Sequence, residues 1–392
     1  MSEINFDPVT LTQSLVKCAS VTPKDEGALT VVENHLSAIG CDCHPLTFSG
    51  NNSYEVKNLF ATIGNEGKHF AYAGHTDVVP VGNESSWKYP PFLAKIDEGK
   101  LYGRGSEDMK SSVACFISAA KRFVDKYKNI PGKISFIITG DEERDSVNGT
   151  PRILEWASKQ NYKFDHCLVG EPTSKNEVGD KVKIGRRGSV SFFFQVKGIQ
   201  GHTANSHLAE NSSHHLVNLL NSILEEPLDE GNENFLPTSV QIATIDIGNP
   251  VQNVIPELAK ATVNIRFNDM HSSDSLIKWI DNKIEKIFSK LENASCTYTY
   301  DATAESFLNK AGDLYNIISK SISDVTGRNS PPEQATDGGT SDARYIKNYC
   351  EVVELGLRNQ TLHKVDEFVF VEDIIKLESI YFRILENYFD VS

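Results

Sequence analysis

The sequence has no uninterrupted apolar run of about 18 residues, which is the length that a membrane-spanning helix requires. Its first residues, Met1 to Asp7, also lack the basic region and apolar stretch of a secretory signal peptide. The seven cysteines are odd in number and scattered along the chain, so a disulfide framework is not expected. These absences predict a protein that works in the reducing cytoplasm and has no membrane partner.

Large basic clusters are missing as well. The formal net charge is −14, and no group of lysines and arginines is large enough to follow a phosphate backbone. Nucleic acid is therefore not an expected partner. The same charge repels acidic small molecules, so an acidic substrate would need local arginines, and the segment from Lys183 to Ser189 holds two of them.

Two common catalytic signatures are also lacking. No Gly-x-Ser-x-Gly motif occurs, which argues against a serine hydrolase. The Gly103-Arg-Gly105 segment lacks the third glycine and the strand-turn-helix context of a dinucleotide-binding motif.

The 392 residues are too many for one ordinary core, so two domains are expected. In the first half, apolar strands alternate with helices, which predicts an α/β fold with a mainly parallel sheet flanked by helices. From Val190 to Tyr300 the order is strand-helix-strand-strand-helix-strand, typical of a ferredoxin-like α+β module. We predict a catalytic domain made of residues 1–182 and 303–392, with an inserted domain at 183–302.

Three predicted apolar strands end in side chains that can bind metals. The sequences that follow these strands are His75-Thr76-Asp77, Asp141-Glu142-Glu143 and Glu171-Pro172. Because sites in open α/β sheets gather beyond the carboxyl ends of the strands, we expect the three segments to converge.

Two further residues are candidate metal ligands, but each also has a simpler explanation. Asp108 stands just before a predicted helix that starts at Met109, where an aspartate usually caps the helix. His363 lies in a polar stretch after another predicted strand, where a histidine is usually a surface residue.

The candidate ligands favour a catalytic metal centre. Imidazole and carboxylate without thiolate suit Zn²⁺, Co²⁺ or Mn²⁺, and the set exceeds the three protein ligands of a single catalytic zinc. A pair of ions bridged by a carboxylate would use all of them. Glu142 and Glu143 are adjacent and point apart, so one can bind metal while the other acts as a general base. The spacing of His75 and Asp77 suggests that Asp77 supports the imidazole.

These residues resemble the dinuclear zinc amidohydrolases, and the resemblance runs from the first helix to the last. The motifs that carry it are Gly74-His-Thr-Asp77, Gly103-Arg-Gly-x-x-Asp-Met-Lys110, Asp141-Glu-Glu143, Val169-Gly-Glu-Pro-Thr173 and His363-Lys-Val365. Narrower motifs resemble the desuccinylases of this family: Gly185-Arg-Arg-Gly-Ser189, Gln200-Gly-His202, Asn253-Val-Ile-Pro256 and Gly338-Gly-Thr-Ser-Asp342.

The resemblance implies a role for each motif residue. His75 and Glu171 would bind one metal ion, Glu143 and His363 the other, and Asp108, followed by a cis peptide, would bridge them. Glu142 would be the general acid and base, and His202 would stabilise the oxyanion across a homodimer formed by the inserted lid domain. The implied substrate contacts are Arg186, Ser189, Asn253, Arg266, Gly339, Thr340 and Asn359.

The implied reaction is hydrolysis of N-succinyl-LL-2,6-diaminopimelate to succinate and LL-2,6-diaminopimelate, on the way to lysine and peptidoglycan. It requires two divalent ions, Zn²⁺ or alternatively Co²⁺, and a small acidic N-acylated amino acid as substrate. The alternatives are another N-acyl amino-acid deacylase, such as an acetylornithine deacetylase, and a relative that binds metal without catalysis. The arginines at 186 and 187 argue against the first alternative, and Glu142 argues against the second.

Several positions depart from the family pattern. Glu107 and Arg144 replace small residues beside expected ligands, and we hypothesise that the two side chains form an ion pair; the alternative is that they are two unrelated, solvated charges. The family pattern also differs at Asn205, Ala343 and Leu357-Arg358. These differences do not affect the expected metal ligands, but they leave the identity of the acyl group on the substrate open.

Overall fold

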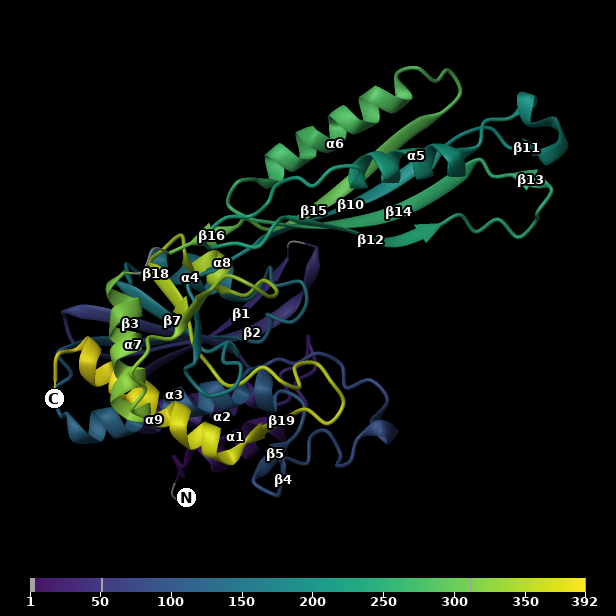
Figure 1. Cartoon of the computed structure of the whole chain (residues 1–392). Helices are drawn as coiled ribbons and strands as arrows, with labels where there is room; N and C mark the ends of the chain where they lie inside the picture. The colour runs from purple at the N-terminus through teal and green to yellow at the C-terminus, as the bar shows by residue number, and fades with distance from the viewer. Residues whose placement is uncertain (1–3, 51, 310–311, 392) are drawn as a thin grey trace. The chain divides into compact units, whose positions relative to one another are not determined.

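The computed structural model describes residues 4–50, 52–309 and 312–391, and the chain divides into two compact units (Figure 1). The first unit comprises residues 1–184, 309–335 and 341–392, and the second comprises residues 185–308 and 336–340.

The first unit is built on an eight-stranded sheet in the order β1-β2-β6-β3-β7-β18-β8-β17. The central strands β6, β3, β7 and β18 are parallel to one another, whereas β1 and β2 form an antiparallel edge. The predicted α/β class with a mainly parallel sheet is confirmed. The strands are β1 (Asp42–Gly50), β2 (Ser53–Gly64), β3 (Lys68–His75), β6 (Gly132–Thr139), β7 (His166–Val169), β8 (Lys181–Lys183), β17 (Glu333–Ala335) and β18 (Glu351–Glu354).

Most residues of helix α3 (Ser111–Lys126) are buried, and the helix packs against this sheet. Its Phe116 stacks on Tyr72 of β3, with 4.2 Å between the ring centroids, because the sheet presents large apolar side chains to it. The other helical segments of this unit are α1 (Pro8–Val16), α2 (Ala28–Ile39), η1 (Glu84–Ser86), η2 (Ser106–Lys110), α4 (Thr150–Lys159), α7 (Asp313–Thr326), α8 (Ala343–Ile346) and α9 (Val371–Tyr388). A small sheet in the order β19-β5-β4 is formed by β4 (Lys95–Asp97), β5 (Lys100–Tyr102) and β19 (Phe368–Phe370).

The second unit is an antiparallel sheet in the order β12-β14-β10-β15, with its core on the side of two helices. Alternate residues of β10, from Val190 to Val196, are buried in that core, as the period of a half-covered strand requires. The chain order matches the predicted ferredoxin-like pattern: β10 (Gly188–Lys197), α5 (Ser212–Leu224), β12 (Ser239–Asp246), β14 (Leu258–Phe267), α6 (Ser273–Phe288) and β15 (Ser295–Ala304). Shorter elements are β9 (Gly185–Arg186), β11 (Gly201–His202), η3 (Thr203–Leu208), β13 (Val254–Ile255) and β16 (Phe307–Leu308).

Among the described residues, no helix combines the length and the apolar character needed to cross a membrane.

A buried histidine in the first unit predicts sensitivity to acid. His69 at the start of β3 is 5% exposed, its Nε2 lies 2.7 Å from the Ser135 hydroxyl, and burial lowers its pKa below the ordinary value. Protonation therefore favours the unfolded chain, so stability is complete above the unfolded pKa of about 6.5 and is lost as the pH falls below it. Between pH 7.5 and 5.5, we expect the urea midpoint of the parent protein to fall further than that of His69→Gln. An equal fall of the urea midpoint in the parent protein and in His69→Gln would contradict this prediction. His207→Gln, which removes a histidine at an exposed position, is the control.

Candidate metal centre

The candidate ligands of the first unit meet at the carboxyl edge of its sheet. His75 is the last residue of β3, Glu143 follows β6, and Glu171 follows β7. Since β6, β3 and β7 are parallel neighbours, their carboxyl ends are adjacent. Asp108 reaches the same place from η2, and His363 from the loop before β19.

Asp108 lies between the two histidines. Its Oδ1 is 3.2 Å from His75 Nε2, and its Oδ2 is 3.4 Å from His363 Nε2. His363 Nε2 is also 3.1 Å from Glu143 Oε1, and His75 Nε2 is 3.9 Å from Glu171 Oε1. The donor atoms fall into two groups that share His75, each within 4.8 Å: one adds Asp108 and Glu143, the other Glu142 and Glu171. The structure thus brings together all five predicted ligands and Glu142.

The simpler alternative for Asp108 is wrong. Helix α3 begins at Ser111, its N-cap position is occupied by Lys110, and no side chain among the described residues caps the helix. The Asp108–Met109 peptide is cis, as the family resemblance implied. His363 is a surface residue, with 44% of its side chain exposed, but its Nε2 faces Asp108 and Glu143.

Asp77 supports the site in two ways. The His75 Nδ1–H group donates to the Asp77 main-chain oxygen at 3.0 Å, which orients the ring so that Nε2 faces the Asp108 carboxylate. The Asp77 carboxylate lies 3.6 Å from Nδ1, so it is not the hydrogen-bond partner of the imidazole. It accepts instead from the main-chain N–H groups of Glu142 and Glu143, both at 3.1 Å, and from the Thr22 hydroxyl at 2.7 Å.

The crowded charges explain the pKa shifts at this site. Burial raises the pKa of Glu142 well above its ordinary value, and the Glu171 carboxylate adds to the shift. Burial and the neighbouring Asp108 raise the pKa of Glu143. The hydrogen bonds to Asp108 and Glu143 raise the pKa of His363 to about 10. Burial opposes ionisation of Asp108 too, but the bonds from His363 and His75 hold its pKa below the usual range.

This donor set fits a pair of divalent cations. The ligand atoms are imidazole nitrogens and carboxylate oxygens, which suit zinc-like ions, and the excess of buried negative charge needs a positive partner. Cations at this place would favour the ionised carboxylates and the neutral imidazoles.

Sequence reasoning missed the side chains that hold the ligand segments. Arg104 and Glu367 form a buried ion pair at 2.6 Å, and the other Glu367 oxygen accepts the N–H groups of Glu107 (2.8 Å) and Asp108 (3.2 Å). The Asp342 carboxylate accepts the hydroxyls of Ser146 (3.2 Å) and Thr150 (2.6 Å), which fixes the segment after Glu143. Arg104, Glu367 and Asp342 stand within or beside the recognised motifs, and that proximity was the only signal in the sequence.

The hypothesised ion pair of Glu107 with Arg144 is wrong. Glu107 Oε2 accepts from the Thr361 main-chain N–H (2.8 Å) and hydroxyl (2.6 Å), and burial raises the pKa of Glu107 to about 7. The Arg144 guanidinium lies over the Tyr54 ring, 5.5 Å from its centroid. Glu107 therefore contacts the loop that begins at Thr361, whereas Arg144 contacts Tyr54.

Most predicted substrate residues belong to the second unit. Arg186 Nη1 donates to the Gly339 oxygen at 2.8 Å, and Ser189 pairs with Arg266 across β10 and β14. His202 in β11 pairs with Val254 of β13, and just beyond this pair the Thr203 N–H donates to the Asn253 oxygen at 3.0 Å. Thr340 also lies in this unit, whereas Asn359 is in the first unit and donates its main-chain N–H to Ser174 O at 2.9 Å.

The geometry predicts different metal stoichiometries for two ligand variants. Asp108→Ala should lose both ions because its oxygens face both histidines, whereas His363→Ala should retain one. Elemental analysis after dialysis against Zn²⁺ would measure this. His166→Ala, at the opposite end of β7, should retain both ions as a control. Two ions in Asp108→Ala would contradict the shared position.

Known proteins resemble this chain over nearly its whole length. Residues 71–387 match the model of peptidase family M20/M25/M40. The succinyl-diaminopimelate desuccinylase of Parvibaculum lavamentivorans is 44% identical over 384 residues, 98% of this chain and 96% of that protein. The Ehrlichia canis enzyme of the same name is 44% identical over 388 residues, 99% of this chain and 100% of that protein.

A solved structure shares the fold. The M20 family metallo-carboxypeptidase Sso-CP2 from Sulfolobus solfataricus superposes with a TM-score of 0.77 at 16% identity, and the match covers 98% of this chain and 100% of that chain. The protein is therefore a member of peptidase family M20/M25/M40, and over nearly its full length it is similar to succinyl-diaminopimelate desuccinylases.

Proposed function

We propose that the protein is a dinuclear metallohydrolase that cleaves N-succinyl-LL-2,6-diaminopimelate into succinate and LL-2,6-diaminopimelate. The observation that carries the proposal is the Asp108 carboxylate shared between His75 and His363, in a chain 44% identical to desuccinylases. The product is a precursor of lysine and peptidoglycan, and the free state of all seven cysteines supports a cytoplasmic location.

In this proposal the metal ligands divide into two sets. His75 and Glu171 would hold one ion, Glu143 and His363 would hold the other, and the Asp108 carboxylate would serve both. Zn²⁺ suits these ligands, and Co²⁺ is an alternative. Such ions polarise the amide carbonyl and lower the pKa of the attacking water.

Glu142 is the proposed general acid and base. Its raised pKa suits a carboxyl group that takes a proton from the attacking water and returns it to the leaving amine near neutral pH. The bond from Glu142 N–H to the Asp77 carboxylate positions this residue beside the ligands. In the proposal Asp77 is therefore catalytically important through the residues that it holds.

The second unit would supply the contacts to an acidic substrate. Arg186 and Arg266 have guanidinium groups that can bind carboxylates in a bidentate manner, and Ser189 lies opposite Arg266. The Nδ1 atom of His202 accepts the Ala204 N–H at 3.0 Å, so the neutral ring carries its proton on Nε2. That N–H group is a suitable donor to an oxyanion. The remaining proposed contacts are Asn253, Gly339, Thr340 and Asn359.

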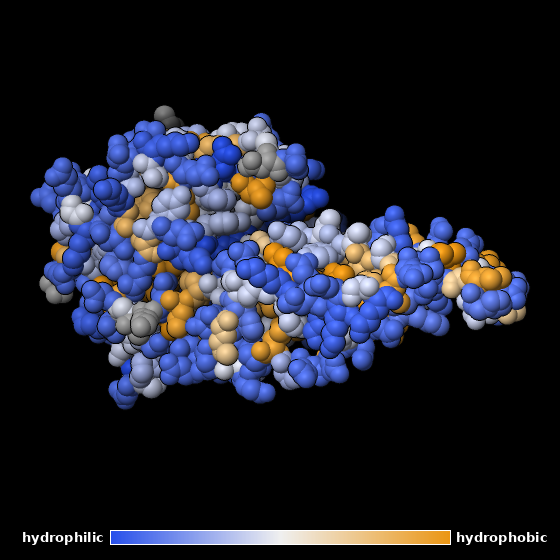
Figure 2. Space-filling view, turned by 90° about the horizontal axis from the view of Figure 1, so that it is seen from above, coloured by the Kyte–Doolittle hydropathy of each residue, from blue (hydrophilic) through white to orange (hydrophobic). Residues whose placement is uncertain are grey.

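We also propose that residues 183–302 are an inserted lid that forms a homodimer. Figure 2 shows apolar side chains among the hydrophilic surface of the second unit. Val217 and Leu224 of α5 are 57% and 51% exposed, and the edge strand β12 exposes Ile245 at 52%. An unpaired edge with apolar neighbours favours association with another copy.

The substrate proposal predicts a kinetic preference. Succinate release from N-succinyl-LL-2,6-diaminopimelate should exceed acetate release from N-acetylornithine in kcat/KM. Glu142→Gln should lower kcat by about 10²- to 10⁴-fold at unchanged metal content, because it removes proton transfer but no ligand. Preference for the acetyl compound would refute the substrate assignment, and unchanged turnover would refute the role of Glu142.

The dimer proposal predicts the mass in solution. Light scattering should give about twice the chain mass of 43.5 kDa. Val217→Glu combined with Leu224→Glu should shift the protein to the monomer, because it buries like charges at the interface. Lys286→Glu, on the exposed side of α6, should leave the mass unchanged as a charge control. A monomeric parent protein would contradict the proposal.

A further inference from the structure

The Glu107 side chain connects two segments that carry candidate metal ligands. Glu107 immediately precedes Asp108, and its side chain is buried, with 1% of the residue exposed. Its Oε2 accepts both the N–H and the hydroxyl of Thr361, which stands two residues before His363. One carboxylate oxygen therefore joins the Asp108 segment to the His363 loop.

Thr361 in turn closes the His363 loop at its base. The Phe368 N–H donates to the Thr361 hydroxyl oxygen at 3.1 Å, so residues 361 and 368 are held together. Within the loop, His363 and Asp366 have φ values of 60° and 58°, a left-handed conformation that is unfavourable for these residues. Such a loop needs contacts from outside to keep one geometry.

A second anchor holds the tip of the loop. The Arg104 guanidinium donates to the main-chain oxygens of Lys364 (3.2 Å) and His363 (3.4 Å), while it also pairs with Glu367. Arg104 thus fixes the main chain around His363, and Glu107 fixes the base of the loop.

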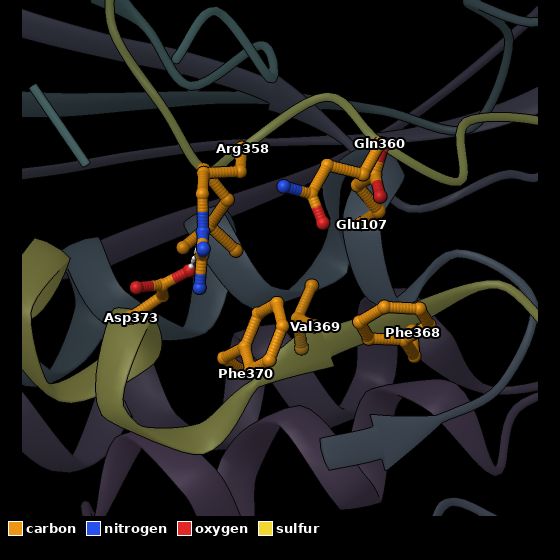
Figure 3. Close-up of a pocket in the computed structure, with 8 residues that line it drawn as sticks. Glu107, Arg358, Gln360, Phe368, Val369, Phe370 and Asp373 are labelled. Atoms are coloured by element: carbon orange, nitrogen blue, oxygen red, sulfur yellow. Dashed lines mark hydrogen bonds and ion pairs between the residues drawn. The ribbon is translucent and has the colours of Figure 1, made fainter. Parts of the chain in front are cut away.

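The surroundings of Glu107 argue for a specific role. Its Oε1 has no hydrogen-bond partner among the described residues, although it is buried. Figure 3 shows Glu107 beside Gln360 at one end of a cavity of about 10 Å³, with the Arg358–Asp373 ion pair at the other end. A buried carboxylate with one unsatisfied oxygen costs folding free energy. The structural contribution of Glu107 therefore lies in its two hydrogen bonds to Thr361.

We propose that Glu107 is a positioning residue that fixes His363 relative to Asp108 and so sets the affinity of the cation position formed by His363 and Glu143. This inference rests on the proposed metal centre. The His363 side chain is 44% exposed, whereas His75 at the end of β3 is 1% exposed. The first ligand therefore depends on its loop contacts, and the second is held by the sheet.

Titration of the metal-free, full-length protein with Co²⁺ tests the inference. In Glu107→Ala, one dissociation constant should rise about tenfold or more, as is typical when a side chain that orients a ligand is removed. The other dissociation constant should stay within about twofold of the parent value. Glu107→Gln keeps an acceptor oxygen and should stay near the parent protein. Thr361→Val removes the hydroxyl that donates to Glu107 and accepts the Phe368 N–H, so it should weaken the same position and leave the other within about twofold.

A matched control separates this role from general stability. Glu386 is also 1% exposed and accepts from Lys126 (2.6 Å) and Tyr127 (2.8 Å) at the far end of α3. Glu386→Ala should lower the unfolding temperature but bind both Co²⁺ ions normally.

The outcomes discriminate between the proposals. Parental binding by Glu107→Ala, or equal weakening of both positions, overturns the inference, and if that variant does not fold, Thr361→Val decides in the same way. If the parent protein binds two Co²⁺ ions but releases no succinate, the proposed function fails, and the titrations of Glu107→Ala and Thr361→Val still decide the inference. If it binds fewer than two, both fail.

Discussion

The structure depends on one shared carboxylate. Asp108 must present one oxygen to His75 and the other to His363, although these residues come from distant parts of the chain. An aspartate side chain is short, so only the placement of its main chain can satisfy both contacts. Glu367 provides that placement by accepting the Asp108 N–H group, and Arg104 holds Glu367 in turn. The Arg104–Glu367 ion pair therefore helps to fix the position of Asp108 between His75 and His363, in addition to stabilising the core.

The same convergence creates an electrostatic conflict. Four carboxylates and two imidazoles occupy a small, largely buried volume, and burial disfavours their charged forms. The raised pKa values of Glu142 and Glu143 are the consequence in the protein alone. Divalent cations would resolve the conflict, because they would favour the ionised carboxylates and the neutral imidazoles. Binding of such ions would therefore stabilise the folded state together with the site.

Sequence patterns predicted this site where regular structure fixes it. His75, Glu143 and Glu171 follow apolar strands, so their meeting at one edge follows from the parallel sheet. The conformation of the irregular segments was harder to predict from the sequence. The N-cap alternative for Asp108 was plausible because the sequence does not show that α3 begins at Ser111. The Glu107–Arg144 pair was wrong because proximity to ligands does not determine where a side chain in a loop points. The roles proposed for the second unit stay predictions.

The supporting carboxylates follow a common physical rule. Asp77, Asp342 and Glu367 each accept N–H or hydroxyl groups from segments that bear ligands. These segments leave the sheet to reach the metal centre, so their N–H groups have no strand partner and require other acceptors. An ionised carboxylate offers two strong acceptor oxygens in a compact side chain. Part of the chain's excess of acidic residues therefore serves as internal scaffolding for the segments that bear ligands.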